Sequence, residues 1–150
     1  MRAASIEKKE LERLLEAEFP ESFGAGTGLD ILAIWHGGCQ IRQNFHERSL
    51  RPGGTLSGVT MMQLADVCVY VAVLASIGWV PLAVTTSLNI NFLRKPAPGA
   101  LIGECKLLKL GKRLAVGEVS IRSEGADDLV AHATATYSIP AGARNMPPES

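Results

Sequence analysis

The sequence predicts an α+β domain in which a curved antiparallel sheet wraps one long central helix. Residues 57–76 predict a helix whose apolar residues cover almost its whole circumference, and Asp66 is the only charged side chain between Leu56 and Leu93. Four later segments alternate apolar and polar residues with period two, as half-buried strands do. The chain has 150 residues, of which 47% are hydrophobic, so we expect one domain over 1–150 with an ample core.

The N-terminal part predicts a helix over residues 5–18. Its apolar residues, Ile6, Leu11, Leu14 and Leu15, recur at helical spacing. Pro20 is expected to stop this helix. The following segment, 21–28, is expected to be a loop. Its glycines do not form a phosphate-binding loop, because no Lys-Ser/Thr follows them at the required spacing.

Six strands and the central helix complete the predicted order. Strands at 29–36 and 39–45 would be joined by a two-residue turn at Gly37–Gly38. A polar loop over 46–56 then leads to the helix at 57–76, for which Ser57 can serve as N-cap. A strand at 84–93 is expected after the helix, followed by three hairpin-joined strands at 101–110, 114–122 and 129–139, which gives a meander with one buried face. In the strand at 84–93, Val84, Leu88, Ile90 and Phe92 alternate with Thr85, Ser87, Asn89 and Asn91. Residues 141–150 are expected to be a loose tail.

Composition and charge exclude several classes of protein. Lys plus Arg is 15 and Asp plus Glu is 15, whereas a nucleic-acid binder usually carries a basic excess. Cys39, Cys68 and Cys105 lie in apolar sequence without a CxxC pair, which favours reduced thiols in a cytoplasmic protein. The histidines do not cluster with them, so no metal site is expected. Residues 1–20 are charged and amphipathic, unlike a signal peptide.

A membrane span is an alternative interpretation of the apolar stretch. Residues 67–84 are almost continuously apolar and about long enough to cross a bilayer. However, Gly78 and Pro81 interrupt the stretch, and Tyr70 and Ser76 lie within it. A buried helix, a short loop and the start of a strand explain these residues better. We therefore expect no membrane partner.

Asp66 is the first candidate for chemistry. A carboxylate in a helix without a solvent face needs a cation or hydrogen bonds to stay ionised, and such a group can act as general base or nucleophile. The plainer interpretation is a helix-edge carboxylate or a salt bridge. The helix start is the second candidate, because Ser57, Gly58 and Val59 present free N–H groups at the positive end of the helix dipole. Such a terminus can hold an oxyanion, although most helices with this geometry are simply capped.

The two candidates lie too far apart to serve one carbonyl within one chain. Asp66 follows Gly58 by eight residues, which is about 12 Å along a helix axis. Two copies with antiparallel central helices could bring Asp66 of one to Gly58 of the other. A second copy would also complete the cover of a helix that is apolar all round. The sequence therefore predicts a homodimer with two sites at its interface.

The stretch RPGGTLSGVTMMQLAD, followed by AVTTSLNINFLRKPAPG, resembles the hotdog-fold acyl-CoA thioesterases of the phenylacetate-pathway (PaaI-like) type. The family pattern is Asn-x-x-Gly-x-x-His-Gly-Gly with an Asp seven residues after the second Gly, then a strand ending in an aromatic and Pro-Ala. Gly58, Asp66, LNINF and KPAPG match it, and the resemblance covers roughly residues 30–140. It implies hydrolysis of acyl-CoA thioesters, without metal or cofactor, by dimers that share a continuous sheet and often pair into tetramers.

The resemblance also implies roles for particular residues. Asp66 would activate water or attack as nucleophile, and the Gly58 N–H would polarise the thioester carbonyl. Thr85 would orient the carboxylate or the water, although a β-branched residue is equally ordinary in a strand.

Three positions depart from the family pattern: Arg51 stands for the Asn, Ser57 for the His and Val59 for the second Gly. Ser57 is itself a good N-cap. Val59 narrows the pocket beside Gly58. Arg51 could replace the Asn as a donor and keep Asp66 ionised, or it could form a salt bridge that silences the site.

Basic pairs could meet the phosphates of CoA. Arg94–Lys95 follows a strand and Lys112–Arg113 lies at a hairpin turn, although both pairs could equally be solvated turn charges. Asn89, within the matching LNINF strand, is a further substrate-binding candidate. His132, on a strand, is expected to be structural.

Two alternatives stand beside this function. A non-catalytic hotdog protein could bind acyl-CoA or another apolar ligand, with Asp66 paired to Arg51. A hotdog hydratase or dehydratase generally uses a His with an acid, and no histidine lies on or just before the central helix.

Overall fold

A computed structural model describes residues 1–24, 28–46, 50, 52, 54 and 56–142. Most of the predicted loop 46–56 and the tail from residue 143 lie outside these residues. The elements in chain order are α1 (Lys8–Glu18), α2 (Pro20–Phe23), β1 (Leu29–Trp35), β2 (Gly38–Gln43), α3 (Gly58–Ile77), β3 (Val84–Phe92), β4 (Leu101–Leu110), β5 (Leu114–Ser123) and β6 (Leu129–Ser138).

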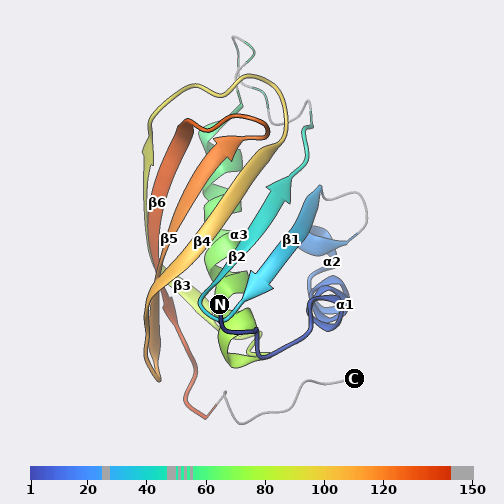
Figure 1. Ribbon diagram of the computed structural model, residues 1–150, viewed down its shortest axis with the longest axis vertical. Coiled ribbons are helices and arrows are strands. Elements are labelled where there is room, and N and C mark those ends of the chain that lie inside the picture. The colour runs from blue at the N-terminus through green and yellow to red at the C-terminus, as the bar shows by residue number, and fades with distance from the viewer. Residues whose placement is uncertain (25–27, 47–49, 51, 53, 55, 143–150) are drawn as a thin grey trace.

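The six strands form one antiparallel sheet in the order β1-β2-β4-β5-β6-β3. Figure 1 shows the sheet curving around α3, with α1 and α2 beside β1. This confirms the predicted architecture of a long helix packed against an antiparallel sheet. β3 precedes β4 in the chain but pairs with β6, so β1 and β3 are the two edges of the sheet.

α3 begins and ends where its sequence signals lie. Ser57 is the N-cap, and its Oγ accepts a hydrogen bond from the Thr60 amide at 3.2 Å. Gly78 follows the last turn with φ of 93°, a conformation that favours glycine. By length and composition α3 could cross a membrane, but it is packed against the sheet and most of it is buried. It is therefore a core helix.

α3 is only partly covered within one chain, and the sequence predicted that a second copy would complete its cover. Its second half, from Cys68 to Ser76, is buried within one chain. Its first half exposes an apolar strip instead, because the sheet does not cover it there. Val59 is 74% exposed and Met62 is 41% exposed.

The N-terminal segment departs from the prediction at both ends. α1 begins at Lys8 and buries Leu11 and Leu14 together with Leu15. Pro20 follows the end of α1, as expected, but it also opens the four-residue helix α2 where a loop was predicted. Proline is favoured at the first position of a helix, because the N–H it lacks has no partner there in any case.

The hairpin between β1 and β2 is confirmed, but its turn lies one residue earlier than predicted. Trp35 pairs with Gly38, so the two turn residues are His36 and Gly37. Gly37 has φ of 97°. Gly38 belongs to the strand. A Cβ there would overlap the Cys105 carbonyl oxygen and lie 2.6 Å from Trp35 Nε1, which explains the glycine at this position.

Candidate active site

Asp66 lies midway along α3 and is half-buried. Its Oδ1 accepts two hydrogen bonds, from Thr85 Oγ1 at 2.5 Å and from Tyr137 Oη at 2.8 Å. The carboxylate thus meets groups from α3, β3 and β6. Among the described residues its recorded partners are these hydroxyls rather than a cation. Within the described part of the chain, Asp66 is therefore held by two neutral hydroxyl donors.

A β-bulge aims Thr85 at Asp66. Thr85 pairs with Tyr137 and Ser87 pairs with Thr136, so Thr86 is the extra residue. The bulge reverses the alternation of β3, because one inserted residue exchanges the two faces of a strand. The expected alternation placed Thr85 on the face opposite to Leu88, and this was wrong. Thr85 instead shares the face of Leu88 and contacts Asp66, while its side chain stays exposed.

Tyr137 was not identified from the sequence as a site residue. It occupies the apolar face of β6, is 3% exposed, and gave no signal beyond that of a core tyrosine. Burial raises the pKa of its phenol well above the usual range, and the nearby Asp66 charge adds to the increase. Tyr137 therefore remains a neutral hydrogen-bond donor to Asp66.

The start of α3 carries the second half of the candidate site. Within the described part of the chain, no acceptor is recorded for the amides of Gly58 and Val59. Gly58 also leaves space for a neighbouring side chain, since a Cβ there would lie 3.1 Å from Phe92 Cζ. The glycine thus allows the Phe92 ring to pack against the start of α3. This packing is a second reason for a glycine here, besides the close approach of a ligand.

The two predicted basic pairs lie near opposite ends of β3. Arg94 and Lys95 are exposed just after Phe92, near the start of α3, where the Leu56 amide donates to the Pro96 carbonyl at 3.3 Å. Asn89 pairs with Thr134 on the outer face of the sheet. Arg51 lies outside the described residues.

Lys112 and Arg113 lie at the opposite end, in the β4–β5 turn. Leu114 and Val84 both pair with Ser138, which places this turn beside the first residue of β3. The Arg113 guanidinium donates to the Ile139 carbonyl at 3.2 Å. The nine residues of β3, about 30 Å long, separate this basic pair from Arg94–Lys95.

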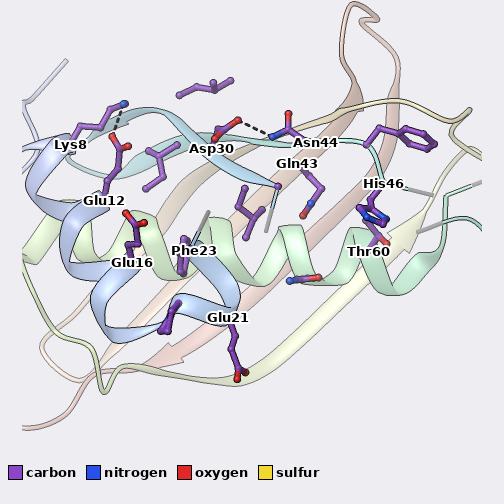
Figure 2. A pocket seen from close by; sticks show the side chains of 18 residues that line it. Lys8, Glu12, Glu16, Glu21, Phe23, Asp30, Gln43, Asn44, His46 and Thr60 are labelled. Atoms are coloured by element: carbon purple, nitrogen blue, oxygen red, sulfur yellow. Dashed lines mark hydrogen bonds and ion pairs between the residues drawn. The ribbon is translucent and has the colours of Figure 1, made fainter. Parts of the chain in front are cut away.

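A groove of about 1110 Å³ lies elsewhere in the chain, between α1, α2 and the β1–β2 hairpin (Figure 2). Thr60 and Gln63 of α3 line one wall, but Asp66 does not. Among the described residues, four carboxylates line the groove, those of Glu12, Glu16, Glu21 and Asp30, which makes it unfavourable for phosphates. None of the predicted site residues that the structure describes lines it.

The cysteines and His132 occupy structural positions. Cys39, Cys68 and Cys105 are free and fully buried, and burial raises the pKa of the Cys39 and Cys105 thiols. His132 Nε2 lies 3.5 Å from a Glu118 carboxylate oxygen, away from Asp66. Across the described ranges, no group of three or more His, Cys, Asp or Glu is placed to hold a metal ion.

Comparisons with known proteins agree with this architecture. The profile of the thioesterase superfamily matches residues 53–136. A Saccharolobus solfataricus protein provisionally named an esterase is 30% identical over 128 residues, which are 85% of this chain and 82% of that protein. The residues matched by the family profile include α3 with Asp66 and β3 with Thr85.

Solved structures show the same fold. A protein of Silicibacter sp. TM1040, provisionally named a thioesterase, is 47% identical with a TM-score of 0.82, covering 91% of this chain and 94% of that one. A mutant of the phenylacetic acid degradation protein PaaI from Thermus thermophilus is 25% identical with a TM-score of 0.67, covering 75% and 94%. The hotdog fold predicted from the sequence is thereby confirmed, and the chain belongs to the thioesterase superfamily.

Proposed function

We propose that this protein hydrolyses acyl-CoA thioesters to a free acid and CoA, at a site shared between two copies of the chain. Thioester hydrolysis in general follows from the family. The observation that carries the finer proposal is the Asp66 carboxylate, held by two hydroxyl donors on a half-exposed face of α3. Its second oxygen, Oδ2, has no partner recorded in the described part of the chain.

The chemistry needs a base and an oxyanion site. Asp66 would take a proton from water, and the resulting hydroxide would attack the thioester carbonyl carbon. The Gly58 N–H, at the positive end of α3, would stabilise the oxyanion. Collapse of the tetrahedral intermediate would break the C–S bond and release the CoA thiolate, which then takes up a proton. Direct attack by Asp66 would give an anhydride that water then opens.

Spacing supports a site built from two chains. Gly58 and Asp66 are about 12 Å apart along one helix, too far for a single carbonyl. β3 has a free edge, and an unpaired edge strand is a ready template for another strand. Exposed apolar side chains line this region: Val59, Met62, Leu82, Val84, Phe92 and Leu93. We infer a homodimer that joins along β3, and a dimer of dimers as its further assembly.

The two basic pairs would reach a given CoA from different copies of the chain. Arg94 and Lys95 are exposed near the helix start where the carbonyl would bind. Lys112 and Arg113 lie at the far end of β3, so a single CoA would meet this pair only from the other copy. We propose that each CoA uses basic residues near Gly58 of one chain or near Asp66 of its partner.

The first experiment measures release of the CoA thiol from a panel of acyl-CoAs. Asp66→Asn and Asp66→Ala should lose most of the activity while keeping the melting temperature of the wild type within a few degrees. If both variants hydrolyse at the wild-type rate, the catalytic assignment is wrong. If the wild type binds acyl-CoA by calorimetry but hydrolyses none of the panel, a non-catalytic binding protein is the better description.

The second experiment tests whether the site is shared. Gly58→Pro removes the N–H at a helix position that tolerates proline, whereas Gly58→Ala adds the same Cβ against Phe92 and keeps the N–H. Gly58→Ala should lose only the activity that the added Cβ costs. Gly58→Pro should lose more, because it also removes the N–H. Inactive Asp66→Ala and Gly58→Pro chains, refolded together, should then recover about a quarter of the wild-type activity, since half of the dimers would contain one intact site of two. A site contained in one chain would recover none.

A further inference from the structure

We propose that Tyr137 is a positioning residue of this site, and that it selects which oxygen of Asp66 acts on the substrate. The inference rests on the proposed function. It concerns a residue that touches Asp66 without reaching the substrate, and whose position on β6 gives it no counterpart in the sequence motif around α3.

The contacts are specific to the hydroxyl group. Tyr137 Oη lies 2.8 Å from Asp66 Oδ1 and 3.1 Å from the main-chain oxygen of Asp66. The phenol thus bridges the carboxylate and the helix backbone of the same residue. A side chain fastened to its own helix in this way has few rotamers left, which is what a catalytic group needs.

The two donors divide the carboxylate into unlike oxygens. Oδ1 receives both the Thr85 and the Tyr137 hydroxyl hydrogens, so its lone pairs are occupied by these two donors. Oδ2 receives neither. The lone pairs of Oδ2 are therefore the ones that accept the proton of water or attack carbon. Tyr137 would hold this oxygen toward the exposed face of α3.

Aromatic packing keeps Tyr137 in place. Its ring lies 6.0 Å from that of Tyr70, which in turn meets Phe19 edge-on at 5.9 Å. The Tyr70 hydroxyl donates to the Pro81 carbonyl at 2.9 Å, and no hydrogen bond from it to the Asp66 carboxylate is recorded. Tyr70 thus offers a matched control: a second buried tyrosine in the same aromatic column, with one hydrogen bond that leads elsewhere.

The test compares Tyr137→Phe with Tyr70→Phe, both assayed for kcat and KM on the best acyl-CoA of the panel. Tyr137→Phe should lower kcat about tenfold, or about 1.4 kcal/mol, with KM within about twofold. Tyr70→Phe should leave both constants within about twofold, even if both variants lose similar thermal stability. Equal effects of the two variants on kcat would overturn the inference, because the loss would then reflect packing alone.

Combination with Asp66→Asn separates this inference from the proposed function. If Tyr137 acts through Asp66, Tyr137→Phe should leave the residual rate of Asp66→Asn unchanged, since the effects of linked groups are not additive. A further tenfold loss in that background would mean that Tyr137 acts independently of Asp66. If Asp66→Asn is inactive while Tyr137→Phe keeps the full rate, positioning fails and the proposed function stands. If Asp66→Asn keeps the full rate, the proposed function fails first.

Discussion

Replacing Gly103 by alanine should separate β4 from α3. A Cβ at Gly103 would lie 2.7 Å from Cys68 Sγ and 3.1 Å from Leu64 Cγ, both on the buried side of α3. Real contacts of this kind essentially never fall below 3.0 Å, so the Cys68 side chain, the helix or the strand must move. Overpacking of this size costs about 1–3 kcal/mol of the free energy of unfolding. For a chain of this length, that corresponds to a decrease of about 2–12 °C in melting temperature.

Urea denaturation with a double-mutant cycle checks the mechanism. Removing the obstructing sulfur with Cys68→Ala should reduce the cost of Gly103→Ala by about 1 kcal/mol or more, because Sγ makes the closest contact. Gly117→Ala, whose nearest atoms would be at 3.2 Å, should cost less than Gly103→Ala. An equal cost of Gly103→Ala with and without Cys68 would refute the steric explanation.

Three further outcomes can be measured. Ser76→Ala should lower the free energy of unfolding in urea by about 1–3 kcal/mol, because Ser76 Oγ accepts the Gly37 amide at 2.8 Å and the variant leaves that N–H unpaired; a loss below about 0.3 kcal/mol would contradict this. Thr85→Val should lower kcat about 10- to 100-fold by removing a bond to a charged group, whereas Thr85→Ser should stay within about threefold; a larger loss in Thr85→Ser than in Thr85→Val would mean that the methyl group, not the hydroxyl, matters. The melting temperature should fall as the pH rises above about 8.5, where the unfolded thiols titrate. Burial raises the pKa of Cys39 and Cys105, so the unfolded chain loses protons first, and stability that is complete below that pH is lost above it. Cys105→Ala should flatten this decline.

Local patterns predicted most of the fold. The apolar run of α3, its serine cap and the glycine after it all lie within one stretch, so their meaning does not depend on the rest of the chain. Strand periodicity was equally local. In β4, however, a bulge between Leu107 and Lys109 interrupts the alternation.

The site was less predictable, because its contacts depend on register between distant strands. The motif located Asp66, but the alternation of β3 placed Thr85 on the wrong face. Only the pairing with β6 shows the bulge that turns it toward Asp66. Tyr137 was missed for the same reason, since a buried tyrosine is common and its hydroxyl partner is set by tertiary structure. The Phe92 ring over Gly58 likewise joins two elements that no local pattern connects.

The pairing of β3 with β6 has a consequence for how the chain is made. During synthesis β3 leaves the ribosome well before β6, because β4 and β5 lie between them in the sequence. Until the last strand is available, β3 has no sheet neighbour, and an unpaired strand is prone to aggregation. Until then Asp66 also lacks its two hydrogen-bond donors, since Thr85 is held by that pairing and Tyr137 lies in β6 itself. The carboxylate therefore acquires its final geometry among the last events of folding.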